Sequence, residues 1–324
     1  MTPVPRLPRL VRAAPLLALC AWLASACSPA LLQHADRRFP QTHVRHVVVI
    51  SVDGLRPDAI EAAGAVHLRR LMDEGAYTLQ ARTITPSKTL PSHTSMLTGV
   101  SPAKHGITWN DDRVDETGRV GVPTVFDLAD SAGLRTAAFF GKAKFRHLVG
   151  AGDPGFWASV PRGAEVLLAP RMVEDVERYL KYRDPELLFV HVSDPDIAGH
   201  STGWMSAPYR AAVRRADAAV GRILRAARAR YGDDMVLIVT ADHGGHSRTH
   251  GTESIDDMTI PWIAWGKGIT PGPIAGPVTT FDTAATVLWL LGIPRPEFWD
   301  GRPVTEAFAF GADRQAEGVT GGVQ

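Results

Sequence analysis

The sequence predicts an α/β fold, a three-layer αβα sandwich in which helices cover both faces of a mostly parallel central sheet. Three observations support this prediction. Continuous apolar, β-branched runs such as residues 46–52 (HVVVISV) are typical of strands buried on both faces. Segments of helical character separate these runs along the chain. Acidic side chains follow several runs, as expected for a site at the carboxyl ends of parallel strands.

The expected elements alternate along the chain. The expected strands are residues 46–52, 136–140, 187–192, 235–240 and 262–265. The expected helices are residues 122–133, 170–183, 207–231 and 281–291. The third helix is the clearest, because its apolar residues fall on one face and most of its arginines fall elsewhere. The fourth is apolar and is stopped by Gly292 and Pro294.

Composition indicates an ordinary globular protein. The chain has 324 residues, 45% of them hydrophobic, and a formal net charge of +1. This is enough apolar material for a sizeable core. The basic residues are dispersed, so no nucleic-acid surface is predicted. Without repeats or an internal linker, residues 45–310 are expected to form a single catalytic domain, and the Gly-rich residues 311–324 a disordered tail. The sequence gives no indication of oligomeric state.

Residues 1–26 have the pattern of a signal peptide, with a basic start, an apolar stretch and the small-residue site Ala24-Ser25-Ala26. Cleavage there makes Cys27 the first mature residue, and the preceding residues resemble a bacterial lipobox. We therefore expect an exported protein of the periplasm or cell envelope, lipid-anchored through Cys27, with residues 27–44 as a tether. Ordinary secretion with an incidental cysteine is the alternative.

Carboxylate and imidazole side chains follow several expected strands. Burying a carboxylate there costs several kcal/mol unless a cation or hydrogen bonds compensate. This favours metal ligation for Asp53, although the residue would also serve as the N-cap of a helix after Asp58. Oxygen and nitrogen ligands from several strand ends are what a two-zinc hydrolytic site needs. The candidate ligands are Asp53, Asp196, His200, Asp242, His243 and His250.

The segment after the strand at 187–192 offers two acids. Asp196 and His200 are four residues apart, a spacing that can bring both to one cation, and Gly199 permits a tight backbone between them. Asp194 is the alternative ligand. It would equally stabilise a turn before Pro195.

The segment after the strand at 235–240 offers an acid and several histidines. Asp242 and His243 are adjacent, and Gly244-Gly245 would let the chain turn so that both side chains point inward. His246 and His250 compete for the remaining ligand position. A lone histidine is more often a surface or core residue, so the neighbouring acids carry the argument for these two.

Thr89, in Lys88-Thr89-Leu90-Pro91-Ser92-His93, is the candidate nucleophile. A threonine hydroxyl attacks poorly because its pKa is very high. Coordination to zinc can lower that pKa enough to give an alkoxide near neutral pH. Outside such a site, Thr89 would be an undistinguished loop residue.

These residues together resemble the alkaline phosphatase superfamily, and most closely its nucleotide pyrophosphatase/phosphodiesterase branch. The resemblance runs from about residue 46 to residue 291. It implies an alkaline-phosphatase-like fold and a hydrolase of small phosphate esters. The matching stretches are residues 47–58 (VVVISVDGLRPD), 85–111 (TPSKTLPSHTSMLTGVSPAKHGITWND), 194–203 (DPDIAGHSTG) and 240–251 (TADHGGHSRTHG).

The resemblance also implies roles for individual residues. Two zinc ions per chain are expected, the first held by Asp196, His200 and His250, the second by Asp53, Asp242, His243 and the Thr89 oxygen. Asn110 would donate a hydrogen bond to a phosphoryl oxygen, and would otherwise be a turn residue. The implied reaction forms a phospho-threonine on Thr89, which water then hydrolyses.

Other functions compete with the phosphodiesterase. Lys142 and Lys144 follow an expected strand, where some phosphomonoesterases of the superfamily bind the extra phosphate charge; alternatively, both are solvated. A sulfatase would need a Cys/Ser-x-Pro-x-Arg frame, but here Thr89 stands in place of the modifiable Cys or Ser and His93 in place of the Arg. A non-catalytic metal-binding lipoprotein is a further alternative, and it would tolerate loss of Thr89.

Overall fold

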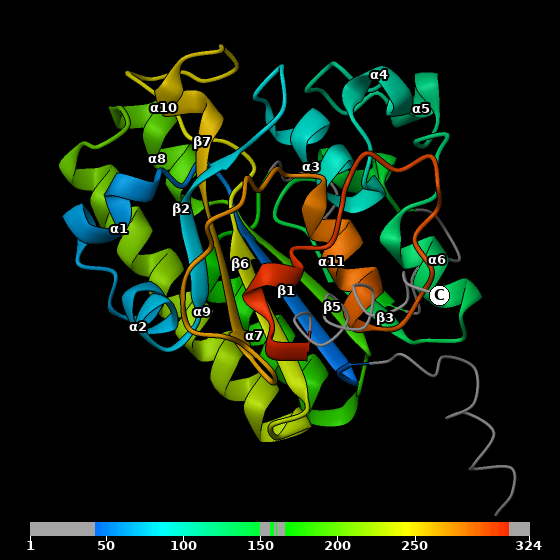
Figure 1. Ribbon diagram of the computed structural model, residues 1–324. Helices are drawn as coiled ribbons and strands as arrows, with labels where there is room; N and C mark the ends of the chain where they lie inside the picture. The colour runs from blue at the N-terminus through cyan, green and yellow to red at the C-terminus, as the bar shows by residue number, and fades with distance from the viewer. Residues whose placement is uncertain (1–42, 150–155, 159, 161–165, 311–324) are drawn as a thin grey trace, which may run out of the picture. The chain divides into compact units, whose positions relative to one another are not determined.

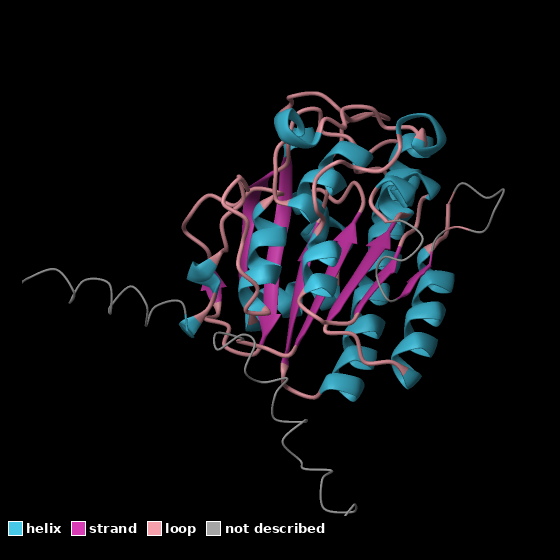
Figure 2. Cartoon of the chain, turned by 90° about the vertical axis from the view of Figure 1, so that its right-hand side faces the viewer, coloured by secondary structure: helices cyan, strands magenta, loops and turns pink. Residues whose placement is uncertain are grey.

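A mixed eight-stranded sheet with helices on both faces organises the computed structural model, which describes residues 43–149, 156–158, 160 and 166–310 (Figure 1, Figure 2). The strand order is β4-β3-β5-β1-β6-β7-β2-β8. The strands are β1 (His46–Val52), β2 (Ala76–Arg82), β3 (Thr136–Phe139), β4 (Phe156–Ala158), β5 (Leu187–Val192), β6 (Met235–Thr240), β7 (Thr259–Gly266) and β8 (Gly272–Pro273).

The sheet is mostly parallel, as predicted. Strands β4, β3, β5, β1 and β6 pair in parallel, and β8 pairs in parallel with β2. Only β7, among the described strands, runs antiparallel to its neighbours β6 and β2. The apolar run at 262–265 predicted β7 but not its direction. A strand buried on both faces has the same apolar pattern whether it is parallel or antiparallel to its neighbours.

Helices cover the two faces of the sheet in separate layers. On one face, the long helix α9 contacts α1, α2, α7 and α8, and on the other α11 contacts α3 and α6 (Figure 1). The helices are α1 (Pro57–Ala63), α2 (Val66–Glu74), α3 (Thr89–Thr98), α4 (Pro102–His105), α5 (Val114–Thr117), α6 (Val125–Ser131), α7 (Ala169–Tyr182), α8 (Asp194–Thr202), α9 (Ala207–Tyr231), α10 (Ile255–Met258) and α11 (Asp282–Leu290). The three-layer αβα prediction is therefore confirmed.

Local sequence explains where two of the predicted helices begin. The Ser206 side chain accepts a hydrogen bond from the Tyr209 N–H and caps α9. Thr124 and Asp127 form a reciprocal capping box at the start of α6. Helix α6 consequently begins at Val125 rather than at residue 122.

Helix α3 is the main element that the sequence did not predict as a helix. All ten of its residues, TLPSHTSMLT, are buried. Amphipathic periodicity arises when one face of a helix meets water. A short helix enclosed on every side therefore shows none, although α3 carries Thr89 at its first position.

The predicted ends of the chain lie mostly outside the described residues. The signal segment 1–26, Cys27, most of the 27–44 tether and the tail 311–324 stay predictions. Val44 is buried, and its backbone N–H donates to the Leu290 carbonyl. The packed part of the chain therefore begins slightly before residue 45. None of the helices within the described part is long and apolar enough to cross a membrane.

Candidate metal centre and active site

Strand register brings the predicted ligands to one edge of the sheet. Ser51 of β1 pairs with Thr240 of β6, and Val52 of β1 pairs with Val192 of β5. These three strands therefore end at nearly the same level. Asp53 follows β1 directly, Asp242 and His243 follow β6, and Asp196 lies in the first turn of α8 after β5.

Each of the three carboxylates is anchored through one oxygen and leaves the other without a hydrogen-bond partner. Asp53 Oδ2 and Asp196 Oδ2 each lie 2.6 Å from Lys142 Nζ. Asp242 Oδ1 accepts from the Gly54 and His243 N–H groups at 3.1 and 3.0 Å. The remaining oxygens, Asp53 Oδ1, Asp196 Oδ1 and Asp242 Oδ2, are buried and unsatisfied. Such a set is costly unless a cation satisfies it.

Three histidines present the matching nitrogen atoms. The Nδ1 atoms of His200, His243 and His250 lie 2.8–3.0 Å from the backbone carbonyls of Arg248, Gly244 and Ser87, respectively. A carbonyl only accepts, so each Nδ1 carries the donating hydrogen. The Nε2 atom of each ring is thereby left for a metal ligand bond.

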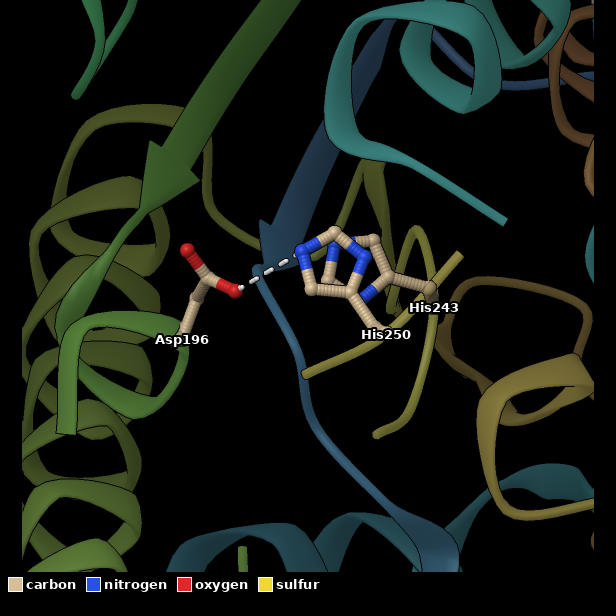
Figure 3. Close-up of side chains that lie close together, drawn as sticks. All are labelled: Asp196, His243 and His250. Atoms are coloured by element: carbon tan, nitrogen blue, oxygen red, sulfur yellow. Dashed lines mark ion pairs between the residues drawn. The ribbon is translucent and has the colours of Figure 1, made fainter. Parts of the chain in front are cut away.

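The Nε2 atoms face the unsatisfied carboxylate oxygens. His243 Nε2 lies 3.3 Å from Asp53 Oδ1 and from Asp242 Oδ2. His200 Nε2 and His250 Nε2 lie 3.3 and 3.6 Å from Asp196 Oδ1. The stacked His243 and His250 rings and the facing Asp196 carboxylate are visible in Figure 3.

Two overlapping groups of ligand atoms result, and in each the atoms lie within 4.8 Å of one another: Asp53, Asp242 and His243, and Asp196, His243 and His250. We call Asp53, Asp242 and His243 the inner group, and Asp196, His200 and His250 the outer group. The structure therefore brings together all six predicted side-chain ligands. Carboxylates mixed with imidazoles suit zinc better than calcium, which prefers oxygen alone.

The electrostatics of the cluster also favour a cation. Burial would lower the pKa of His243, but the carboxylates of Asp242 and Asp53 raise it to about 9. Burial and the charge of Asp53 raise the pKa of Asp242 well above its usual range. Burial opposes ionisation of Asp53 too, yet the Lys142 ammonium holds the pKa of that carboxyl well below its usual range. Three converging carboxylates thus draw positive charge to the His243 Nε2 position.

Thr89 and Asn110 lie beside the inner group. Thr89 Oγ1 is 3.3 Å from His243 Nε2. The Leu90 N–H donates to Asn110 Oδ1 at 2.9 Å. Since the amide oxygen of Asn110 is used in that bond, its NH₂ group remains to donate elsewhere. Thr89 and Asn110 are 21 positions apart in the sequence. The hydrogen bond from the Leu90 N–H brings Asn110 to the first turn of α3, next to Thr89.

The two predicted lysines lie in different surroundings. The Lys142 side chain is only 9% exposed and bridges Asp53 and Asp196, which excludes the fully solvated alternative for this residue. These carboxylates raise the pKa of Lys142 despite its burial. Lys144 is half-buried at the start of the 3₁₀ segment Ala143–His147, and burial and the neighbouring Lys142 charge lower its pKa.

The alternative ligands are engaged elsewhere. Asp194 accepts hydrogen bonds from the Ala169 N–H at 2.8 Å and from Arg215 Nε at 3.2 Å. His246 Nδ1 pairs with Asp257 Oδ1 at 2.7 Å, which secures the loop before α10. Between the competing candidates for a ligand place, the structure therefore brings Asp196 and His250 to the cluster.

Glycines allow the close approaches that shape the turn after β6. A Cβ on Gly244 would come within 1.9 Å of the Asp256 carbonyl oxygen, and one on Gly245 within 2.2 Å of the Trp204 ring. Only glycine fits in these two positions. The turn that points Asp242 and His243 inward depends on both, as the sequence suggested.

Two buried histidines beneath the cluster were not predicted as site residues. His191 Nε2 lies 3.0 Å from Asp53 Oδ2. His93 Nε2 lies 2.8 Å from Ser51 Oγ, and its Nδ1 lies 2.8 Å from the Thr89 carbonyl. For His191, the sequence signal that could have found it is an imidazole inside the apolar run LLFVHV. A fully buried polar ring needs hydrogen-bond partners.

Comparison with known proteins agrees with this arrangement. The parallel sheet with a carboxylate–histidine cluster at its carboxyl edge defines an alkaline-phosphatase-like protein, and solved structures of that fold align closely. Murine ectonucleotide pyrophosphatase/phosphodiesterase 5, as an inactive variant with AMP, aligns over 79% of this chain and 98% of its own, with a TM-score of 0.67 and 16% identity. A 2-O GAG sulfatase aligns over 82% of this chain and 74% of its own, with a TM-score of 0.66 and 16% identity.

The family follows from the sequence match. The chain belongs to the type I phosphodiesterase / nucleotide pyrophosphatase family, whose model matches residues 47–263. Ectonucleotide pyrophosphatase/phosphodiesterase family member 3 of Rattus norvegicus is 24% identical over 245 residues, 69% of this chain. The match covers 27% of that relative, so this chain spans less than a third of its length. The sulfatase likeness concerns the fold alone.

Proposed function

We propose that this protein is a zinc-dependent hydrolase of small phosphate esters that acts through a phospho-threonine on Thr89, most readily as a phosphodiesterase or nucleotide pyrophosphatase. The observation that carries the proposal is the set of three buried, unsatisfied carboxylate oxygens facing three histidine Nε2 atoms beside the Thr89 hydroxyl. The family match supports the phosphate-ester substrate class.

Two zinc ions fit the donor set. The outer group, Asp196, His200 and His250, would hold one ion. The inner group, Asp53, Asp242 and His243, would hold the other together with the Thr89 oxygen. Bound zinc would supply Lewis-acid stabilisation of phosphoryl charge and would lower the pKa of a coordinated hydroxyl.

The protein's own residues then carry out two displacements. Thr89 Oγ1 gives up its proton and attacks phosphorus, the bond to the leaving oxygen breaks, that oxygen takes up a proton, and the phosphoryl group remains on Thr89 as an ester. Water attacks the same phosphorus in the second step, and the Thr89 hydroxyl is restored with release of the phosphate product. Asn110, oriented by the Leu90 N–H, donates its free NH₂ to a phosphoryl oxygen in both transition states.

Zinc titration of the full-length protein tests this proposal. The chelated protein is expected to be inactive on a nitrophenyl phosphodiester and on nitrophenyl phosphate, and to regain activity as zinc approaches two ions per chain. Activity that survives exhaustive chelation would contradict the proposal. Stoichiometric zinc binding with no turnover of either substrate would favour the non-catalytic lipoprotein.

A phosphomonoesterase is the second candidate, and Lys142 and Lys144 favour it. Lys142 touches two members of the carboxylate cluster, and Lys144 interacts electrostatically with the same two, Asp53 and Asp196. A dianionic monoester gains more from added positive charge than a monoanionic diester does. The ratio of kcat/KM on the two nitrophenyl substrates separates the candidates: a strong diester preference supports the phosphodiesterase, and a strong monoester preference supports substrate binding by the lysines.

The setting of this activity is also proposed. Residues 45–310 would form the catalytic domain of a protein exported by the 1–26 segment and attached to a bacterial membrane through Cys27. A small nucleotide is one substrate to try, because AMP is the ligand of the aligned murine relative. Metabolic labelling with a fatty acid, compared between the natural chain and Cys27→Ser, tests the anchor; equal labelling would contradict it.

A further inference from the structure

His191 joins three elements beneath the metal-binding cluster. It lies on β5, directly opposite Ser51 of β1, and is fully buried. Its Nε2 lies 3.0 Å from Asp53 Oδ2, after β1. Its Nδ1 lies 3.2 Å from the backbone nitrogen of Gly141, after β3. One ring therefore connects the ends of β1, β5 and β3.

The backbone contact determines where the ring hydrogen lies. A peptide N–H can only donate, so Gly141 donates to Nδ1 and that nitrogen bears no hydrogen. In a neutral imidazole the hydrogen must then lie on Nε2. His191 consequently donates from Nε2 to Asp53 Oδ2, while the Ser193 hydroxyl, 3.3 Å from Nδ1, can donate to the same nitrogen as Gly141.

This bond and the Lys142 contact together direct one oxygen of Asp53 toward the metal site. Asp53 Oδ2 is occupied by His191 at 3.0 Å and by Lys142 at 2.6 Å. Asp53 Oδ1 has no hydrogen-bond partner and faces His243 Nε2 at 3.3 Å. Without the His191 contact, Lys142 alone would hold the carboxylate on that side.

The approach of Gly141 to His191 is unusually close, which indicates a built contact. A Cβ on Gly141 would come within 2.2 Å of Ser193 Oγ and 2.9 Å of His191 Nδ1. A larger residue at this position would displace the Ser193 hydroxyl and press on the His191 ring. The ring is further enclosed by Phe145 and His93, with ring centroids at 4.6 and 4.8 Å.

We propose that His191 is a positioning residue that holds Asp53 with Oδ1 directed at the inner zinc ion. The inference rests on the proposed two-zinc function and adds to it a residue outside the ligand set. Hydrogen-bond partners of metal ligands typically contribute 10–100-fold to metal affinity. Loss of His191 should therefore weaken zinc at the inner group and spare the outer group, which His191 does not contact in the described structure.

Three substitutions separate the Nε2 bond to Asp53 from the contacts at Nδ1, where Gly141 N–H and Ser193 Oγ lie at 3.2 and 3.3 Å. His191→Phe keeps a ring and removes the hydrogen bonds at both nitrogens. His191→Gln offers an amide N–H at a reach similar to Nε2, so it keeps donation to Asp53. His191→Asn offers an amide oxygen near the Nδ1 position, so it keeps the Gly141 bond and loses the Asp53 bond.

His46→Phe is the matched control. His46 is also a buried histidine, at the other end of β1, where its Nδ1 donates to the Pro185 carbonyl and its ring stacks on Tyr231. It contacts none of the proposed ligands. Its replacement therefore reports the general cost of losing a buried imidazole.

Competition titration of each metal-free, full-length variant with zinc and a chromophoric chelator gives the two affinities. We expect His191→Phe and His191→Asn to weaken one zinc site about 10–100-fold and leave the other unchanged. His191→Gln should lie closer to the natural protein, and His46→Phe should match it. Excess zinc should restore turnover by His191→Phe, because no reacting group is lost. Thermal unfolding confirms that each variant is folded. If His191→Phe does not fold, His191→Asn provides the test.

Unchanged zinc affinities in His191→Asn, or equal weakening of both sites, would overturn the positioning role. A natural protein that fails to bind two zinc ions would instead contradict the proposed function. The two failures are therefore distinguishable in one experiment.

Discussion

The inner and outer groups of the candidate metal centre differ most in exposure. The side chains of Asp53, Asp242 and His243 are 0% exposed; in the outer group Asp196 and His250 are 5% exposed, and only His200, at 47%, is open to solvent. The inner group also adjoins Thr89, and backbone N–H groups or buried side chains anchor its carboxylates. The comparison suggests a division of labour. On the proposed mechanism, the enclosed inner group would serve the attack by Thr89, and the outer group, open to solvent at His200, would serve the departure of the leaving group.

Replacing the nucleophile should have the largest effect. We expect Thr89→Ala to lower kcat roughly 10³-fold or more, as loss of a covalent nucleophile does in other hydrolases. Zinc content should stay near two ions per chain, because the six Asp and His ligands remain. Steady-state kinetics and metal analysis check this.

Thr98→Ala is the matched control for that variant, because Thr98 is also buried in α3 and its hydroxyl donates to the Thr94 carbonyl. It should keep most of its activity. If Thr89→Ala were as active as this control, the nucleophile assignment would be wrong.

Removing one ligand of the outer group should weaken zinc binding at one of the two sites. We expect His200→Ala to lose one zinc ion at concentrations where the natural protein keeps two, and to regain activity with excess zinc. The side chain is half exposed, so its loss leaves no sealed cavity. The comparison is sharpened by His246→Ala, which removes a neighbouring histidine paired with Asp257. Equal zinc loss in both variants would remove the distinction between His200 and His246.

Lys144 offers a smaller, substrate-dependent effect. If the protein accepts monoesters, Lys144→Ala should lower kcat/KM on nitrophenyl phosphate about tenfold, or about 1.4 kcal/mol, and change the diester value less. Lys181→Ala, on α7 and engaged with the Tyr182 ring, serves as the control. Equal losses on both substrates would assign Lys144 no role in discriminating phosphate charge.

Replacing Asp242 should have the smallest effect, and the effect is on the free energy of unfolding. Its pKa is raised in the folded protein by burial and by Asp53. Without zinc, its ionisation therefore favours unfolding, and stability is lost as pH rises from the ordinary carboxylate pKa through the raised value. We expect metal-free Asp242→Asn to be more stable than the natural protein by about 1 kcal/mol or more at neutral pH.

The gain should vanish at a pH below the ordinary pKa of an aspartate, where Asp242 is protonated in both folded and unfolded states. Denaturant unfolding of both metal-free proteins across this pH range measures it. A variant that is less stable than the natural protein at neutral pH would show that Asp242 is not under electrostatic strain.

The sequence predicted the regular parts of the fold closely and the connections less well. Strands β1, β5 and β6 and helix α9 agree with the predicted bounds, because continuous burial and one-sided amphipathicity leave strong patterns. Several shorter elements were not predicted, among them strand β2 and helices α1, α2, α3 and α8. The burial of α3 on all sides removes its periodicity, and β2 alternates weakly before a polar segment.

The candidate site shows the same contrast. Acids and histidines at strand ends were visible in the sequence, but their hydrogen-bond partners depend on distant segments. Lys142 comes to lie between Asp53 and Asp196 only because β3, β1 and β5 end at one edge. Likewise, the choice of Asp196 over Asp194 depends on Arg215 of α9, which binds Asp194.

The most direct test of this account is to trap the enzyme during turnover. The full-length, zinc-loaded protein would be mixed with a phosphate ester, quenched in acid and digested, and its peptides analysed by mass spectrometry. The account predicts a phosphoryl group on Thr89, with its remaining ester substituent if the substrate is a diester, and no such label in Thr89→Ala. Turnover with the label absent from Thr89, or present on another residue, would contradict it.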